Sequence, residues 1–87
     1  MQFEIGKIIN FDNYVGEIMS LSGDKHIFLC QDLREAYEDL KDKTIIFRPE
    51  EINNEKRAFY VQKLENILND KSNIKEIVLK IKKNIDN

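Results

Sequence analysis

The chain contains one histidine and one cysteine, the two side chains best suited to nucleophilic or metal chemistry. Side chains alternate along a strand, so His26 and Cys30 would share one face if both lie on the same strand. A zinc site needs further ligands, and a Cys–His nucleophile pair needs a third group to orient the histidine. We therefore expect His26 to be a partly buried, hydrogen-bonded imidazole, and we expect no metal site.

Acidic pairs are the other candidates for catalysis. Glu38-Asp39 and Glu50-Glu51 lie in polar segments, where carboxylates are usually surface charges and not an acid–base dyad. The chain has only 3 glycines, and they form no phosphate-binding loop. The sequence therefore predicts no catalytic residue and no cofactor, and favours a binding protein over an enzyme.

The charge of the 87 residues is weakly acidic, at −2, which is not typical of a general phosphate binder. The distribution is uneven. Residues 1–64 carry 9 Lys and Arg against 12 Asp and Glu, whereas residues 65–87 carry 5 lysines against 4 acids. The lysines of residues 71–83 form a local basic stripe, whose simplest interpretation is a solvated helix face.

Length and segment types favour a single cytoplasmic domain. A chain of 87 residues is the size of one domain. No run approaches the ~18 apolar residues of a membrane span, so we expect no membrane contact. The first residues, Met1–Gly6, do not resemble a signal peptide, and a single cysteine suits a reducing compartment.

Runs of β-forming residues between turn signals predict a three-stranded meander. An early glycine, Gly6, could mark a bulge in the first strand. The predicted strands are Phe3–Phe11, Tyr14–Leu21 and His26–Cys30. The turns between them are Asp12-Asn13 and Ser22-Gly23-Asp24.

The segment Gln31–Leu40 reads as a short helix, with Asp32 as N-cap and Glu35 completing a capping box. Thr44–Arg48 predicts a fourth strand that ends at Pro49, because proline has no amide hydrogen for strand pairing.

Two further segments complete this part of the chain. Glu50–Lys56 reads as a polar loop, and Arg57–Leu64 reads as a fifth strand or the start of a helix.

Residues 72–86 give the clearest helical pattern in the chain. Ser72 can cap the helix, and apolar residues then recur on one face at helical spacing. These are Ile74, Ile77, Val78, Ile81 and Ile85.

Five strands with a long connection after the third fit an OB-type barrel, and the strand sequences resemble the cold-shock family over residues 3–64. The similar segments are Gly6–Phe11 (family Gly-Lys-Val-Lys-Trp-Phe), Val15–Ile18 (Phe-Gly-Phe-Ile), His26–Cys30 (Val-Phe-Val-His-Phe), Leu40–Phe47 and Ala58–Leu64. The resemblance implies a mainly β fold, a five-stranded OB-type barrel over residues 1–64. Residues 65–87 would form a C-terminal amphipathic helical extension. It also implies that His26 points into the barrel, where the family has valine.

The family binds single strands by stacking bases on outward aromatic rings, each worth about 1–3 kcal/mol. This chain has no aromatic ring at the matching positions, and one of them is an anion. The replacements are Asn10, Val15, Glu17, Ile27, Leu29 and Cys30. The remaining rings on predicted outer surfaces are Tyr14, Phe59 and Tyr60. The aliphatic replacements predict a surface that needs a cover, and residues 72–86 of this or a neighbouring chain would supply it.

Two functions follow as hypotheses. The first is a divergent cold-shock-like module that binds single-stranded RNA or DNA weakly and with little sequence preference. Its expected binding residues are Lys7, Tyr14, Lys56, Arg57, Tyr60 and Lys63. The alternative is a protein-interaction or dimerisation module on an OB fold that has lost nucleic-acid binding, with self-association through the helix 72–86.

Overall fold

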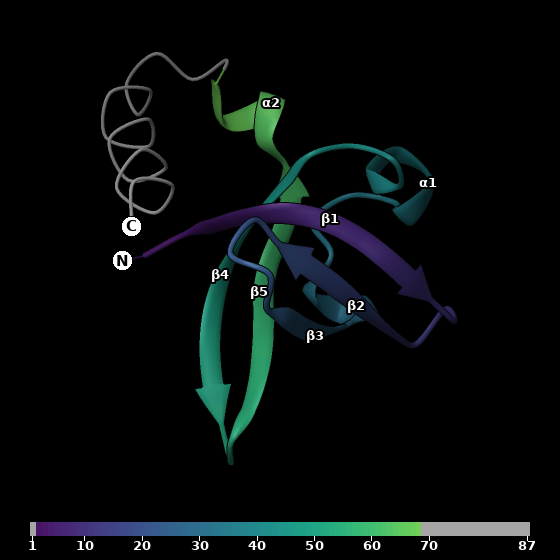
Figure 1. The fold of residues 1–87 in the computed structure, drawn as a ribbon. Coiled ribbons are helices and arrows are strands. Elements are labelled where there is room, and N and C mark those ends of the chain that lie inside the picture. The colour runs from purple at the N-terminus through teal and green to yellow at the C-terminus, as the bar shows by residue number, and fades with distance from the viewer. Residues whose placement is uncertain (1, 69–87) are drawn as a thin grey trace.

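The structure is a computed structural model that describes residues 2–68. The chain is mainly β, as predicted, with five strands in one sheet and short helical segments (Figure 1). The strands are β1 (Glu4–Phe11), β2 (Val15–Ser20), β3 (Lys25–Leu29), β4 (Ile45–Ile52) and β5 (Glu55–Lys63). The helical segments are η1 (Cys30–Asp32), α1 (Tyr37–Leu40) and α2 (Leu64–Leu68).

The sheet closes on itself in the order β1-β2-β3-β5-β4, with β4 pairing back to β1. We call this arrangement the strand ring. All neighbouring strands are antiparallel except β3 and β5, which run parallel and are paired at Ile27 and Arg57. The long connection from β3 to β4 carries η1 and α1 across the end of the strand ring (Figure 1).

Side chains alternate between inward and outward positions along the strands, and the inward apolar ones fill the interior of the strand ring. The buried apolar residues that form the core are Ile18, Phe28, Leu40, Ile45, Phe47, Ala58 and Val61. Leu40 is contributed by α1, so this short helix covers an open end of the core. Tyr37 of the same helix places its aromatic ring 4.9 Å from that of Phe11.

His26 points into the strand ring, as the resemblance implied, and its side chain is buried. The imidazole Nε2 lies 3.3 Å from a carboxylate oxygen of Glu4, and the imidazole ring is 5.0 Å from that of Phe47. His26 Nδ1 has no hydrogen-bond partner among the described residues. The histidine is therefore part of the fold's interior.

The predicted helix Gln31–Leu40 is wrong in its start and in its cap. The α-helical part begins at Tyr37, after Ala36 as N-cap. Asp32 instead accepts a hydrogen bond from the Leu29 amide at 2.8 Å. Glu35 accepts one from the Lys63 amide, also at 2.8 Å. The two carboxylates that would cap a helix are thus used to attach the connection to β3 and β5.

The predicted end of the fourth strand at Pro49 is also wrong, because β4 continues to Ile52. β1 pairs with β4 only as far as Phe47, so the strand edge at Pro49 has no neighbour on that side to receive an amide hydrogen. The predicted loop Glu50–Lys56 is therefore a hairpin. It turns at Asn53 and Asn54, both with positive φ, which asparagine tolerates in tight hairpin turns.

The three-stranded meander and the fifth strand are confirmed. The bulge of the first strand lies between Ile8 and Asn10 and not at Gly6. Gly6 serves a different purpose, because a Cβ atom there would overlap backbone atoms of Met19 and Ser20. The predicted helix 72–86 lies outside the described residues. Among residues 2–68, no helix has the length and apolar character required to cross a bilayer.

Gly6→Ala is expected to destabilise the fold, because the atoms that it would meet belong to the backbone of β2 and cannot rotate away. Overpacking of this kind costs about 1–3 kcal/mol, and each kcal/mol lowers Tm by about 4–8 °C in a domain of this size. Thermal unfolding followed by circular dichroism measures the effect. Lys7→Ala, at the exposed neighbouring position, is the control. An unchanged Tm for Gly6→Ala would contradict the tight β1–β2 approach.

Candidate functional site

A bulge in β5 places two consecutive aromatic residues on the outside of the strand ring. Ala58 and Val61 are both buried in the core, so two residues lie between successive inward positions where regular alternation allows one. The register between β4 and β5 shifts at this point, and Tyr60 has a φ of 54°. A bulky residue is rarely found in this left-handed region. The bulge therefore adds the outward ring of Tyr60 to that of Phe59.

Arginines alternate with these two rings to form a continuous row. The Cζ atoms of Arg34 and Arg48 lie 4.4 and 4.8 Å from the centroid of the Tyr60 ring. Those of Arg57 and Arg48 lie 5.2 and 5.5 Å from the centroid of the Phe59 ring. All four distances are within the range of cation–π interactions. We refer to the series Arg57, Phe59, Arg48, Tyr60 and Arg34 as the arginine–aromatic row.

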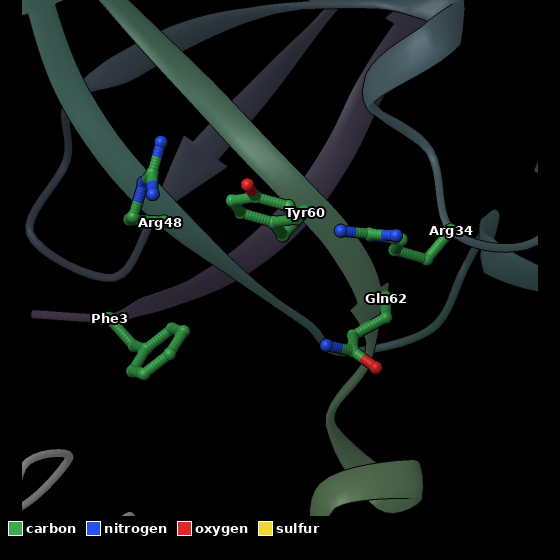
Figure 2. Close-up of a pocket in the computed structure, with 5 residues that line it drawn as sticks. All are labelled: Phe3, Arg34, Arg48, Tyr60 and Gln62. Atoms are coloured by element: carbon green, nitrogen blue, oxygen red, sulfur yellow. The ribbon is translucent and has the colours of Figure 1, made fainter. Parts of the chain in front are cut away.

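The row ends at an open pocket of about 470 Å³. In Figure 2, the Tyr60 ring lies between the guanidinium groups of Arg34 and Arg48. Phe3 and Gln62 complete the lining, and Tyr60 is 40% exposed. The pocket thus presents planar cations, aromatic rings and an amide at one surface.

The charges of the row are unequally compensated. Arg48 Nη2 is 2.7 Å from a carboxylate oxygen of Glu50, and Arg57 Nη2 is 3.6 Å from one of Asp32. Arg34 forms no ion pair among the described residues, and its described side-chain contact is with the Tyr60 ring. An anion that approaches the pocket therefore finds Arg34 as the uncompensated cation.

Of the predicted binding residues, Arg57 and Tyr60 come together in the row. Lys56 and Lys63 lie elsewhere and are in ion pairs: Lys56 Nζ is 3.0 Å from Asp24, and Lys63 Nζ is 3.5 Å from Glu35. Arg57 is also part of the fold, because its Nε donates to the Ile27 carbonyl at 3.3 Å.

Glu35 and Lys63 shift each other's titration. Burial opposes ionisation of Glu35, but hydrogen bonds from the Lys63 amide and from Asn66, with the Lys63 charge, outweigh it and lower the pKa of Glu35. Burial likewise opposes the charged form of Lys63, but Glu35 raises the pKa of Lys63 above its usual value. This pair is therefore ionised at neutral pH, and it attaches the β3–β4 connection to the end of β5.

The two remaining predicted residues, Lys7 and Tyr14, lie away from the pocket. Lys7 is an exposed residue of β1. Tyr14 is 74% exposed in the turn between β1 and β2. They are beside the surface that the resemblance would assign to stacking, and not beside Tyr60.

That surface is formed by outward side chains of the first three strands, and we call it the β1–β3 face. Its members are Asn10, Val15, Glu17, Ile27 and Leu29. Strand pairing sets Val15 opposite Leu29, and Glu17 opposite both Asn10 and Ile27. Asn10 Nδ2 donates to Glu17 at 2.6 Å. The face is aliphatic with one exposed polar pair, and Val15 is 41% exposed.

Four residues of the pocket were not predicted as site residues. They are Phe3, Arg34, Arg48 and Gln62. Their spacing in the chain shows no common pattern, because they come from the segment before β1, the β3–β4 connection, β4 and β5. The adjacent aromatics Phe59-Tyr60, flanked by inward Ala58 and Val61, were the available clue to a bulge.

The structure does not bring His26 and Cys30 together in a reactive site. Cys30 begins η1 and is exposed, whereas His26 is buried within the strand ring. Within residues 2–68, no three His, Cys, Asp or Glu side chains gather in a group that could hold a metal ion.

Comparison with protein-family models gives no match to this chain, and comparison with curated proteins gives none. The cold-shock resemblance therefore stays a prediction from the sequence.

Glu35→Gln is expected to destabilise the protein at neutral pH by about 1–2 kcal/mol, because it removes charge-assisted hydrogen bonds. A carboxyl with a lowered pKa stabilises the folded state above its unfolded pKa of about 4.3, and this contribution is lost as the pH falls through the folded pKa. The Tm difference from the wild type should therefore be largest near pH 7 and shrink below about pH 4.

Glu38→Gln provides the control, because the Glu38 side chain is 76% exposed and is 3.8 Å from its partner Lys41. Its Tm should follow the wild type throughout the titration. A Glu35→Gln deficit of constant size from neutral to acid pH would show that the ionised carboxylate is not the stabilising group.

Proposed function

We propose that this domain is a divergent OB-type module that binds single-stranded nucleic acid weakly, with little sequence preference. The binding surface is the arginine–aromatic row and its pocket, and not the β1–β3 face. The strand order and the long connection after β3 support an OB-type scaffold. The sequence resemblance over residues 3–64 supports the ligand class.

The observation that carries the proposal is the exposed Tyr60 ring, held between two guanidinium groups at the mouth of a pocket. Proteins that bind single strands combine aromatic rings, on which bases stack, with cations that contact phosphates. Guanidinium planes also stack on bases. In this proposal Arg34 contacts a phosphate, and bases stack on the exposed part of the Tyr60 ring, on the guanidinium planes beside it and on Phe3.

The pocket also explains why sequence preference should be low. Stacking and phosphate contacts do not depend on which base is bound. Gln62 is the lining side chain whose amide can both donate to and accept from a base edge. A single such group gives modest discrimination among bases.

The β1–β3 face argues against binding in the manner of the cold-shock family. The outward side chains that define it include no aromatic ring, and Glu17 would repel phosphates. Lys56 and Lys63, which were expected to contact the backbone, face carboxylates instead. The nucleic acid would therefore contact β4 and β5.

Tyr60→Ala should weaken binding of a fluorescein-labelled single strand by about 5- to 150-fold, because base–aromatic stacking contributes about 1–3 kcal/mol. Tyr60→Phe, which keeps the aromatic ring, should retain most of the affinity. The measurement is fluorescence anisotropy with oligo-dT and oligo-U of about ten nucleotides, within the site size of an OB fold.

Tyr14→Ala is the matched control, because it removes an exposed tyrosine that does not line the pocket. Its affinity should equal that of the wild type. Loss of binding in Tyr14→Ala with full binding in Tyr60→Ala would assign the ligand to the β1–β3 face and reject the proposal.

Salt dependence should be shallow for a nucleic-acid-binding protein. One or two phosphate contacts, by Arg34 and partly by Arg48, predict a slope of log K against log salt of about −0.7 to −1.4. Titrations from about 50 to 200 mM salt measure this slope. Arg34→Gln should reduce its magnitude, whereas Lys7→Gln should leave it unchanged. A steep slope in the wild type would require many more cations than the row provides.

A further inference from the structure

A second surface depression lies on the β1–β3 face. This groove has a volume of about 480 Å³. Its lining residues are Asn10, Phe11, Asp12, Val15, Glu17 and Ile27. Three of them are apolar, two are carboxylates and none is a cation. The groove therefore suits a ligand that is both aliphatic and basic.

The carboxylates of the groove are held in place by the fold. Asp12 accepts hydrogen bonds from the amides of Tyr14 and Val15 at 2.9 and 2.8 Å. These hydrogen bonds lower the pKa of Asp12, so it is ionised at neutral pH. Glu17 is oriented by its 2.6 Å hydrogen bond from Asn10. The negative charge thus lies beside the apolar side chains Val15 and Ile27.

The chain itself contains a segment with the complementary chemistry. Residues 72–86 carry the isoleucine stripe predicted to be one helix face, and they hold four lysines and two acids. Apolar side chains of such a segment would bury the exposed Val15 and the neighbouring Ile27. Its lysines would face Asp12 and Glu17. These charge pairs would attract the segment and also fix its position along the groove.

The place where the chain leaves the strand ring favours a segment from another molecule. Leu64 begins α2 beside Thr44, to which its amide is bonded at 3.0 Å. This is the end of the ring where Gly6 pairs with Ile45. The groove is at the other end of β1, about 17 Å away over five strand residues. The five residues of α2 rise about 7 Å, but they lead away from the arrowhead end of β1 (Figure 1). The residues 69–71 that follow span at most about 11 Å, which is less than the distance back to the groove.

We propose that the groove on the β1–β3 face binds residues 72–86 of a second copy of this chain. The interaction is independent of nucleic-acid binding, because the groove shares no residue with the pocket beside Tyr60. Two copies would use the segment reciprocally, as expected for a two-fold symmetric dimer.

Cys30 permits a test without altering the groove. It is the only cysteine of the chain, it is exposed, and its amide is bonded to the Tyr14 carbonyl at 2.9 Å, beside the groove. The full chain carrying a nitroxide on Cys30 is mixed with an equal amount of ¹⁵N-labelled Cys30→Ser chain. Amide signals of residues 72–86 in the ¹⁵N chain should broaden and recover when the nitroxide is reduced.

Glu17→Lys and Glu51→Lys distinguish a loss of binding in the groove from an effect of net charge, since both exchange one carboxylate for an ammonium group. Glu51 is exposed on the β4–β5 hairpin, outside the groove. Sedimentation equilibrium should give a dimer dissociation constant at least about tenfold higher for Glu17→Lys, and an unchanged one for Glu51→Lys.

Three results would overturn the proposal. One is a monomer at all concentrations with no broadening in the mixture. Another is broadening of residues 72–86 in a ¹⁵N-labelled, nitroxide-carrying chain diluted into unlabelled Cys30→Ser chain, with none in the first mixture, which would place its own segment in the groove. The third is equal weakening of the dimer by both lysine substitutions. Each outcome leaves the oligonucleotide titrations interpretable, because those depend on Tyr60.

Discussion

The strand ring depends on how β5 is held against β3, where a single parallel pair joins the two strands. Arg57 makes two side-chain polar contacts at this seam. Its Nε donates to the Ile27 carbonyl at 3.3 Å, and its Nη2 lies 3.6 Å from Asp32. Asp32 in turn accepts a hydrogen bond from the Leu29 amide. These contacts hold β5 in the ring, together with the Arg34 amide, which donates to the Val61 carbonyl at 2.8 Å.

The bulge at Tyr60 is the second constraint on the outward side chains of β5. A bulky residue with positive φ costs of order 1–3 kcal/mol, and it persists because Ala58 and Val61 must both face the core on either side. Each exposed cation–π contact contributes about 0.5–1 kcal/mol, so Arg34 and Arg48 together offset much of that strain. The strained residue is therefore the same one that gives the outer surface its exposed aromatic ring.

Strands with regular alternation of inward and outward side chains could be predicted from the sequence. The positions where alternation fails could not. The runs that became β1, β2 and β3 alternate or carry turn residues at their ends, so their positions followed from the sequence. β5 breaks alternation at Tyr60. The sequence therefore did not show that the Tyr60 ring faces outward beside Arg34 and Arg48, which come from other parts of the chain. Pro49 suggested a strand end because the sequence does not show that this edge lacks a neighbour. Asp32 and Glu35 fit a capping box, but tertiary partners, the amides of Leu29 and Lys63, used them instead.

The two faces of the ring offer different chemistry: cations and aromatic rings along β4 and β5, and aliphatic side chains with carboxylates along β1 to β3. The central claim is that a single strand contacts the first of these. The most direct measurement is a ¹H–¹⁵N NMR titration of the full chain with oligo-dT. The account predicts that shifts concentrate at Arg34, Arg48 and residues 59–62. Shifts confined to Val15, Ile27 and Leu29, with the signals of β5 unmoved, would contradict it.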